Sequence, residues 1–315
     1  DSIYEGSETA IIAITGVSGG SATENGAQSQ TITITDSLSA PTVTLSTSAS
    51  SVAENGSDLT LTATLNRQTF EDVTVTLTGT GTSTAGTDYA SLSTITISAG
   101  STTGTTTFNP TDDSIYEGSE TAIIAITGVS GGDATENATQ SETITITDNE
   151  SAPTVTLSTS ASSVAENGSN LTLTATLSGA TSEDVTVTLT GTGTSTAGTD
   201  YASLSTITIS AGSTTGTTTF NPTDDSIYEG SETAIIAITG VSGGSATENG
   251  AQSQTITITD SLSAPTVTLS TSASSVAENG SDLTLTATLN RQTFEDVTVT
   301  LTGTGTSTAG TDYAS

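Results

Sequence analysis

The sequence contains no cysteine, methionine, tryptophan or histidine among its 315 residues. Disulfide bonds are therefore excluded, and the preferred protein ligands of zinc and copper are missing. Lysine is also absent, and Arg67 and Arg291 are the two basic residues. Apart from carboxylates the chain lacks the usual general bases, and it has no phosphate-binding glycine loop. We predict that it is not an enzyme.

Positive charge is scarce, because 34 acidic residues face two basic ones and the net charge is −32. Such a chain repels nucleic acid and anionic membrane surfaces, so we expect no nucleic-acid partner. The natural counterpart of its charge is a cation. No apolar run reaches the length of about 18 residues that a membrane-spanning helix needs, so no membrane span is expected in this segment.

The chain repeats itself with a period of 112 residues. The motif Asp-Ser-Ile-Tyr-Glu-Gly begins at residues 1, 113 and 225, and residues 1–91 are identical to 225–315. Two versions of the repeat therefore alternate. Short Ser-Ala-Pro joints mark the boundaries, so neighbouring repeats of the same chain are the first expected partners. The positions of these joints predict the C-terminal part of a repeat at 1–39, complete repeats at 40–151 and 152–263, and the N-terminal part of another at 264–315.

Apolar residues alternate with threonine, as in Leu-Thr-Leu-Thr-Ala-Thr-Leu at 59–65, and no helical period is present. Strict alternation predicts β-strands with one buried face. In the first complete repeat we expect seven strands, near 42–53, 58–66, 71–79, 93–98, 104–109, 119–128 and 140–147. The predicted fold class is all-β, with tandem immunoglobulin-like seven-stranded β-sandwiches.

Acidic residues follow the first, third, fifth and seventh of these predicted strands. In an up-and-down order the ends of odd-numbered strands lie at the same end of the domain, so these carboxylates should converge. Oxygen ligands with several carboxylates suit Ca²⁺. A solvated acidic rim that keeps the protein soluble is the alternative interpretation. The predicted ligands are Glu54, Asp88, Asp112, Asp113, Glu117, Asp148 and Glu150.

The motifs Val-Ala-Glu-Asn-Gly at 52–56, Ala-Gly-Thr-Asp-Tyr at 85–89, Asp-Asp-Ser-Ile-Tyr-Glu at 112–117 and Ile-Thr-Ile-Thr-Asp at 144–148 resemble those of the Calx-beta repeat family. The resemblance covers the whole chain. It implies an immunoglobulin-like sandwich and, as in some members, Ca²⁺ bound through these positions. It adds the main-chain carbonyl of Ile115 to the ligands. In the second repeat it implies Glu166, Asp200, Asp224, Asp225, Ile227, Glu229 and Asp260.

The two complete repeats differ at 11 of 112 positions. The last predicted strand is followed by Asp-Asn-Glu at 148–150 in the first repeat and by Asp-Ser-Leu at 260–262 in the second. We therefore predict that the first site holds more Ca²⁺. The loop at 66–70 also differs, and it is expected at the end opposite the acids. Its Arg67 and Phe70 are either a contact point or ordinary loop variation.

These features predict the stalk or spacer of a large extracellular cell-surface adhesin, stiffened by Ca²⁺ at the joints between domains. The threonine-rich, lysine-free surface resembles giant bacterial adhesins, including those displayed by gliding bacteria. Contacts with surface polysaccharide or other cells are expected to lie in other regions of the parent chain. A self-associating filament or matrix protein and a Ca²⁺-responsive regulatory module are the alternatives.

Overall fold

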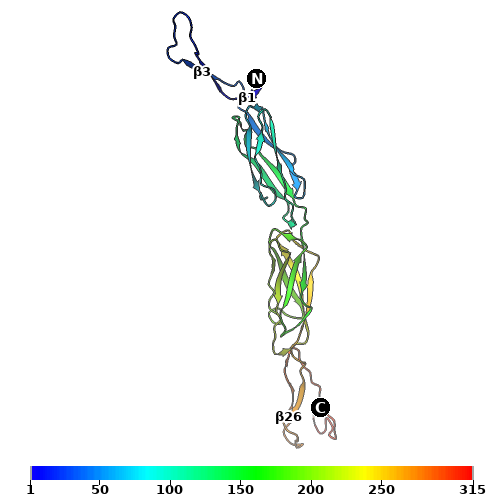
Figure 1. Ribbon diagram of the computed structural model, residues 1–315. Coiled ribbons are helices and arrows are strands. Elements are labelled where there is room, and N and C mark those ends of the chain that lie inside the picture. Colours follow the sequence, from blue (N-terminus) through cyan, green and yellow to red (C-terminus); the bar gives the residue numbers. More distant parts are fainter. Residues whose placement is uncertain (1, 314–315) are drawn as a thin grey trace. The chain divides into compact units, whose positions relative to one another are not determined.

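The computed structural model describes residues 2–313, so residue 1 of the predicted segment 1–39 and residues 314–315 of the segment 264–315 lie outside it. The chain divides into two compact units, residues 1–151 and 152–315, which are described separately. Figure 1 shows arrows for strands, and no helix is present among residues 2–313. Within that range no helix could therefore cross a membrane. The all-β prediction is confirmed.

Two sheets pack face to face in residues 40–151. The four-stranded sheet has the order β10-β6-β4-β13, and the five-stranded sheet has the order β5-β14-β12-β8-β9. The four-stranded sheet consists of β4 (Thr42–Thr47), β6 (Leu59–Leu65), β10 (Thr103–Phe108) and β13 (Thr135–Glu136). The five-stranded sheet consists of β5 (Ser51–Ala53), β8 (Val73–Gly81), β9 (Ile95–Ile97), β12 (Glu120–Ser130) and β14 (Ser141–Thr147).

The single strand expected at 42–53 is divided between the two sheets. β4 is antiparallel to β6, whereas β5 is parallel to β14. The change of sheet occurs in a short polar stretch, where the Ser48 N–H donates to the Thr60 carbonyl at 2.9 Å and the Ser50 carbonyl accepts from the Thr145 N–H at 2.9 Å. As a consequence, the residues after β5 lie beside the end of β14.

The core follows the alternation in the sequence. On β6 the four apolar side chains are buried, while the threonines between them are exposed or half-buried. Alternation of side chains across a pleated strand produces this pattern. Tyr89 and Phe108 are almost fully buried, and their rings stack with centroids 4.8 Å apart. The core of residues 40–151 is thus built from strands of both sheets.

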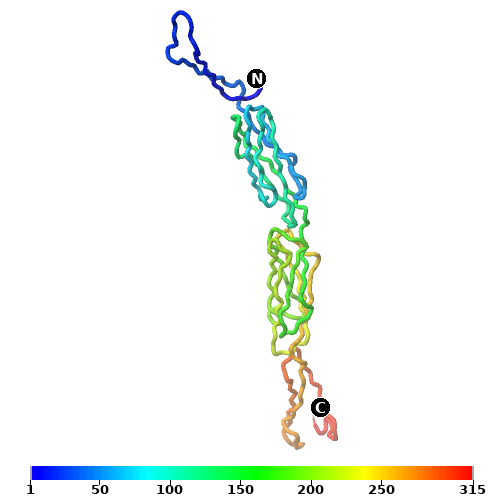
Figure 2. Tube along the Cα trace, in the orientation of Figure 1, coloured from blue at the N-terminus to red at the C-terminus, as the bar shows by residue number. Residues whose placement is uncertain are grey.

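Residues 152–263 repeat this sandwich, with the orders β21-β17-β15-β24 and β16-β25-β23-β19-β20. Figure 2 traces the chain through this second sandwich. Tyr201 and Phe220 stack at 4.8 Å in its core. The strands of the two sheets are β15 (Thr154–Thr159), β16 (Ser163–Ala165), β17 (Leu171–Leu177), β19 (Val185–Gly193), β20 (Ile207–Ile209), β21 (Thr215–Phe220), β23 (Glu232–Ser242), β24 (Thr247–Glu248) and β25 (Ser253–Thr259), and the short strand β18 (Ala180–Thr181) lies outside both sheets.

The terminal segments each form one hairpin of the same sandwich. β2 (Glu8–Ala13) pairs with β3 (Ser29–Ile34), and β26 (Val267–Thr271) pairs with β27 (Leu285–Leu289). Ile12 is 59% exposed, whereas Ile124 at the same position of the complete repeat is 0% exposed. The apolar face of these hairpins is the face that a second sheet covers in the complete repeats.

Short parallel ladders connect each unit's complete repeat to its terminal segment. β1 (Ile3–Tyr4) pairs with β7 (Gln68–Thr69), and β22 (Ile227–Tyr228) pairs with β28 (Gln292–Thr293). In both cases the Ile-Tyr motif of one repeat pairs with a loop of the following repeat, which is residues 66–70 in one unit and residues 290–294 in the other. The equivalent motif in residues 40–151 is β11 (Ile115–Tyr116).

Candidate metal centre at the acidic end of the repeat

Glu54 and Asp148 are neighbours because β5 and β14 run parallel. Ala53 is paired with Thr147, and the N–H of Glu54 donates to the Thr147 carbonyl at 3.0 Å. Each strand then ends in an acidic residue at the same edge of the sheet. This register brings together two residues that are almost a hundred positions apart in the sequence.

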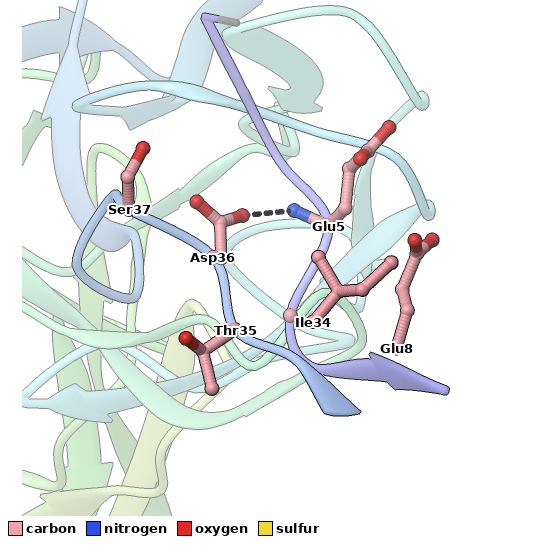
Figure 3. Close-up of a pocket in the computed structure, with 7 residues that line it drawn as sticks. Glu5, Glu8, Ile34, Thr35, Asp36 and Ser37 are labelled. Carbon is pink, nitrogen blue, oxygen red and sulfur yellow. Dashed lines mark hydrogen bonds between the residues drawn. The ribbon is translucent and has the colours of Figure 1, made fainter. Parts of the chain in front are cut away.

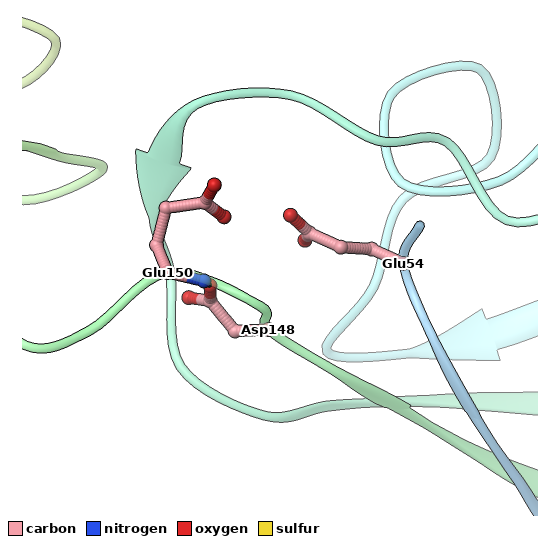
Figure 4. A group of neighbouring side chains, drawn as sticks. All are labelled: Glu54, Asp148 and Glu150. Carbon is pink, nitrogen blue, oxygen red and sulfur yellow. The ribbon is translucent and has the colours of Figure 1, made fainter. Parts of the chain in front are cut away.

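The first carboxylate group consists of Glu54, Asp148 and Glu150, each with an oxygen within 4.8 Å of the others. Figure 4 shows the Glu54 and Glu150 carboxylates pointing toward one another, with Asp148 beside them. The side chain of Glu54 is only 6% exposed. Its Oε1 and the Oε2 of Glu150 are buried and have no hydrogen-bond partner among the described residues.

Asp148 is fixed by backbone donors. Its Oδ2 accepts from the N–H groups of Glu117 and Gly118, both at 2.6 Å, and its Oδ1 accepts from the N–H of Glu150 at 2.7 Å. A carboxylate with three such bonds is held in one orientation. Asp148 therefore connects the loop that precedes β12 to the segment that follows β14.

A second group consists of Asp88, Glu117 and Glu120, also with oxygens within 4.8 Å of one another. Asp88 is 8% exposed, and its Oδ2 accepts from the Thr84 N–H at 2.5 Å. Glu120 was missed by the sequence interpretation because it is the first residue of β12 and reads as part of a strand. Its spacing of three residues from Glu117 is the signal that could have identified it.

Asp112, Asp113 and Ile115 lie outside both groups. Asp112 Oδ1 accepts from Asn149 Nδ2 at 3.0 Å, and Asp113 Oδ1 accepts from the N–H of Ile115 at 2.7 Å. Both aspartates are exposed, and Ile115 is half-buried. Their roles as ligands, including that of the Ile115 carbonyl, stay predictions.

Crowding changes the acidity of these side chains. Burial, followed by the neighbouring carboxylates of Glu150 and Asp148, raises the pKa of Glu54 to about 8. Burial and the charge of Asp88 raise the pKa of Glu120 to about 7, and the same two causes raise the pKa of Glu117. Like charges held together in a poorly solvated place favour either protonation or a bound cation.

Residues 152–263 keep the second group and lose a member of the first. Asp200, Glu229 and Glu232 cluster as their counterparts do. Glu166 is 6% exposed with a buried, unpartnered Oε2, and burial and the charge of Asp260 raise its pKa to about 7. At the third position Leu262 replaces the glutamate.

The backbone hydrogen bonds around these residues of the second repeat are nevertheless the same as in the first. Asp260 accepts from the N–H groups of Glu229 at 2.6 Å, Gly230 at 3.0 Å and Leu262 at 2.7 Å. Asp224 accepts from the Ser261 hydroxyl at 2.7 Å, and Asp225 from the N–H of Ile227 at 2.7 Å.

The N-terminal segment contains a third copy of part of this arrangement. Figure 3 shows Asp36 accepting a hydrogen bond from the N–H of Glu5, at 2.7 Å, in a pocket that Glu8 also lines. Asp36 also accepts from the N–H of Leu38 at 2.7 Å. The aspartate after the last strand thus accepts from the N–H groups at the same two positions in each of the three copies, and in the N-terminal segment one hairpin is sufficient to place them.

The donor set fits Ca²⁺ better than a solvated rim. All side-chain donors are oxygens, most of them carboxylates, which are the ligands that Ca²⁺ prefers. A solvated rim would leave the carboxylates in water, yet Glu54, Asp88, Glu166 and Asp200 are at most 8% exposed. Three carboxylate oxygens are buried without a hydrogen-bond partner, namely Oε1 of Glu54, Oε2 of Glu150 and Oε2 of Glu166. A bound cation would satisfy them.

Comparison with known proteins gives one family. Residues 39–149 and 152–261 each match the family model of the LapA domain. No curated protein matches the sequence. A crystal structure of a tetra-tandem repeat in the extending region of a large adhesion protein is 15% identical, with a TM-score of 0.39, and the alignment covers 90% of this chain and 70% of that one.

Two solved Calx structures are also similar. The crystal structure of CBD12 from CALX1.2 is 14% identical with a TM-score of 0.31, covering 68% of this chain and 99% of that one. The apo form of the Calx CBD1 domain is 21% identical with a TM-score of 0.30, covering 34% of this chain and 97% of that one.

Proposed function

Because the chain belongs to the LapA-domain family of large-adhesin repeats, we propose that it is part of an extracellular stalk whose joints are stiffened by Ca²⁺. Its role is structural and not enzymatic. The proposal retains the division into 1–39, 40–151, 152–263 and 264–315, and each complete repeat carries its own acidic end. Adhesion to other cells or to surface polysaccharide then belongs to other regions of the parent protein.

The unpartnered oxygens of Glu54 and Glu166 carry this proposal. Both side chains are 6% exposed and lack a donor at one oxygen. A buried carboxylate without a partner costs free energy, and near neutral pH it is stabilised either by a proton or by a cation. A bound Ca²⁺ would offset two of the three negative charges of Glu54, Asp148 and Glu150, and a second position is offered by Asp88, Glu117 and Glu120.

The acidic end and the joint share one loop, which supports a stiffening role. In residues 152–313, Glu229 directly follows Tyr228, and the Tyr228 carbonyl accepts from the N–H of Phe294 in the next repeat at 3.1 Å. A cation held by Glu229 and Asp200 would order this loop and the ladder that it forms. Without a cation, repulsion between the carboxylates acts on the same loop.

Calorimetric titration of the 315-residue chain with Ca²⁺, together with thermal melting in Ca²⁺ and in a chelator, tests binding. We expect binding at both complete repeats and a melting temperature that is higher in Ca²⁺. Magnesium is the control, because it prefers few carboxylates and retained water. No heat of binding and unchanged melting would contradict the calcium part of the proposal.

Small-angle scattering tests the stiffening separately. We expect a narrow distribution of interatomic distances in Ca²⁺ and a broader one after chelation. Sedimentation of the same samples distinguishes a stalk from a self-associating filament, because the stalk remains monomeric in both conditions. Identical scattering with and without the bound ion would reject stiffened joints even where calorimetry shows binding.

A further inference from the structure

The end of the sandwich opposite the acidic end also contacts a neighbouring repeat. β12 begins beside the acidic end at Glu120 and finishes at Ser130, three residues before Asp133. Asp133 and the short strand β7 lie at this opposite end, where the preceding segment arrives with its Ile-Tyr motif, β1, in a parallel pair with β7. We call residues 68–70 together with Asp133 the docking face.

The ladder between β1 and β7 uses main-chain groups. The Phe70 N–H donates to the Tyr4 carbonyl at 3.1 Å, whereas the side chain of Phe70 is 68% exposed. The neighbouring Thr69 is fully buried, and its carbonyl accepts from the Gly100 N–H at 2.8 Å. The strand that receives Tyr4 is therefore fixed to the body of its own repeat.

Asp133 adds a side-chain contact to this ladder. Its Oδ2 accepts from the Tyr4 hydroxyl at 3.1 Å, and the hydroxyl is the donor because an ionised carboxylate only accepts. The same oxygen lies 3.3 Å from the place that a Cβ on Gly6 would occupy. Most described residues of 2–39 are exposed, whereas Tyr4 and Gly6 are half-buried. Asp133 thus contacts the preceding segment at two positions.

The two versions of the repeat differ in this contact. They differ at 11 positions, and residues 68, 70 and 133, which all contact the Ile-Tyr motif, are three of them. The second complete repeat has Ser245 in place of Asp133. The backbone is the same, because φ is 49° at Asp133 and 51° at Ser245. A serine side chain is shorter and uncharged, so the exchange removes the acceptor without altering the chain path.

A carboxylate at this place has two effects of opposite sign. Glu5 and Glu71 line the same pocket as Tyr4 and Asp133, so a third negative charge there opposes closure of the joint. A hydrogen bond from the Tyr4 hydroxyl to a charged acceptor favours closure and is stronger than one to a neutral acceptor. A variant that removes the carboxylate therefore shows by its sign which effect dominates.

We propose that the docking face binds the Ile-Tyr motif of the preceding repeat, with Asp133 as the acceptor that closes this joint without a bound ion. The version of the repeat with serine, as at Ser245, retains a short strand at the equivalent place, β18, but lacks the acceptor. The two versions therefore form joints of two strengths, and the tighter joint precedes the version with aspartate. This proposal does not rest on Ca²⁺, because Asp133 lies at the opposite end of the repeat from the carboxylate groups.

Hydrogen exchange of the full 315-residue chain, labelled with ¹⁵N-phenylalanine, measures the opening of the joint. The chain contains four phenylalanines and so gives four labelled amides. The Phe70 amide donates to the Tyr4 carbonyl and reports this joint, whereas Phe294 reports the equivalent ladder in the other unit. Phe108 and Phe220 are fully buried and report the two cores. The variant Phe70→Leu assigns the first signal.

We expect Asp133→Ser, which copies Ser245, to make the Phe70 amide exchange about fivefold faster in chelator, with the other three amides unchanged. Tyr4→Phe, which adds one signal of its own, should give the same acceleration. Adding it to Asp133→Ser should accelerate exchange no further, because both changes remove the same hydrogen bond. Asp133→Asn is the matched control, because it removes the charge, keeps an acceptor oxygen and should retain most of the protection.

Equal or slower exchange of Phe70 in Asp133→Ser would overturn the proposal, because repulsion would then match or outweigh the hydrogen bond. Accelerations that multiply in the double variant would overturn it as well, since the two side chains would then act independently. An acceleration shared by all four amides would show a loss of overall stability in place of an opened joint, and would also count against it. All exchange is measured in chelator, so the result does not depend on whether Ca²⁺ binds.

Discussion

The carboxylate of Glu54 faces that of Glu150 at the edge where β5 and β14 end together (Figure 4). Glu54 is nearly fully buried, and burial and the Glu150 carboxylate raise its pKa to about 8. A folded protein that places two such groups together has lower stability than the same fold with one of them neutral.

Glu54→Gln should have opposite effects with and without Ca²⁺. In chelator the neutral amide removes repulsion, so we expect a higher melting temperature than that of the wild type. In Ca²⁺ the variant loses a ligand, and its affinity at this repeat should fall by about tenfold or more. Melting in both conditions and calorimetry measure this.

The matched control is Glu142→Gln, which removes the same charge away from the acidic end and copies the residue at Gln254. It should change neither the affinity nor the response to chelation. A Glu54→Gln variant that behaves like this control would exclude Glu54 as a ligand.

The metal-free protein should lose stability as the pH rises. The pKa of Glu54 is 4.5 in its ordinary range and about 8 in the fold, and that of Glu120 is raised to about 7. A raised folded-state pKa means that the native state binds the proton more tightly. Its contribution to stability is fully present below about pH 4.5 and is lost as the pH rises through about 8.

Calcium should reverse this dependence, because it requires ionised carboxylates and competes with the proton. Melting temperatures in chelator and in Ca²⁺, measured from about pH 5 to 9, should therefore diverge as the pH increases. Parallel curves in the two conditions would be evidence against carboxylates as the binding groups.

Exchanging Glu150 and Leu262 should exchange the properties of the two repeats. Glu150→Leu should lower the amount of Ca²⁺ bound by residues 40–151, and Leu262→Glu should raise the amount bound by residues 152–263. The backbone N–H of each residue donates to the aspartate two positions earlier, at 2.7 Å in both repeats. Because the backbone is the same, neither change should disturb the fold. Calorimetric stoichiometry of each variant and of the double exchange decides this, and an unchanged total in the single variants would contradict it.

Asp148→Asn should destabilise the repeat even without Ca²⁺. Both oxygens of Asp148 accept backbone N–H groups, at 2.6 and 2.7 Å. The amide nitrogen of asparagine cannot accept, so at least one partly buried N–H loses its partner, at a cost of about 1 kcal/mol. Denaturant unfolding in chelator measures the free energy of unfolding of the variant. Asp112→Asn, at an exposed aspartate, is the control, and it should change the free energy of unfolding by no more than about 0.5 kcal/mol.

Gly79→Ala should test the packing of the buried tyrosine. A Cβ at Gly79 would overlap the hydroxyl oxygen of Tyr89. Overpacking of this kind costs about 1–3 kcal/mol, and Tyr89→Phe in the same chain should restore part of it. Gly128→Ala, whose Cβ would meet Thr76 at an ordinary 3.7 Å, is the control.

Much of this protein could be predicted from local sequence. The alternation on β6 and β8 determined that both are strands and which side chains are buried, because the pleat of a strand has a period of two. The recurrence of one motif every 112 residues determined that the sandwich is repeated. The aspartate after the last strand accepts from backbone N–H groups 30 or 31 positions earlier in all three copies. The hairpin of the last two long strands, which the alternation predicts, brings these groups together.

Only the tertiary structure determined which acidic side chains lie close together. The strand expected at 42–53 divides between two sheets, and only the parallel register of β5 with β14 brings Glu54 to Glu150. Glu120 looked like an ordinary strand residue until its carboxylate was placed beside Asp88. The pairing of residues 227–228 with residues 292–293 of the following repeat was equally hidden. Sequence spacing fixes neither strand register between distant segments nor burial, and both of these determine which like charges meet and how strongly they repel.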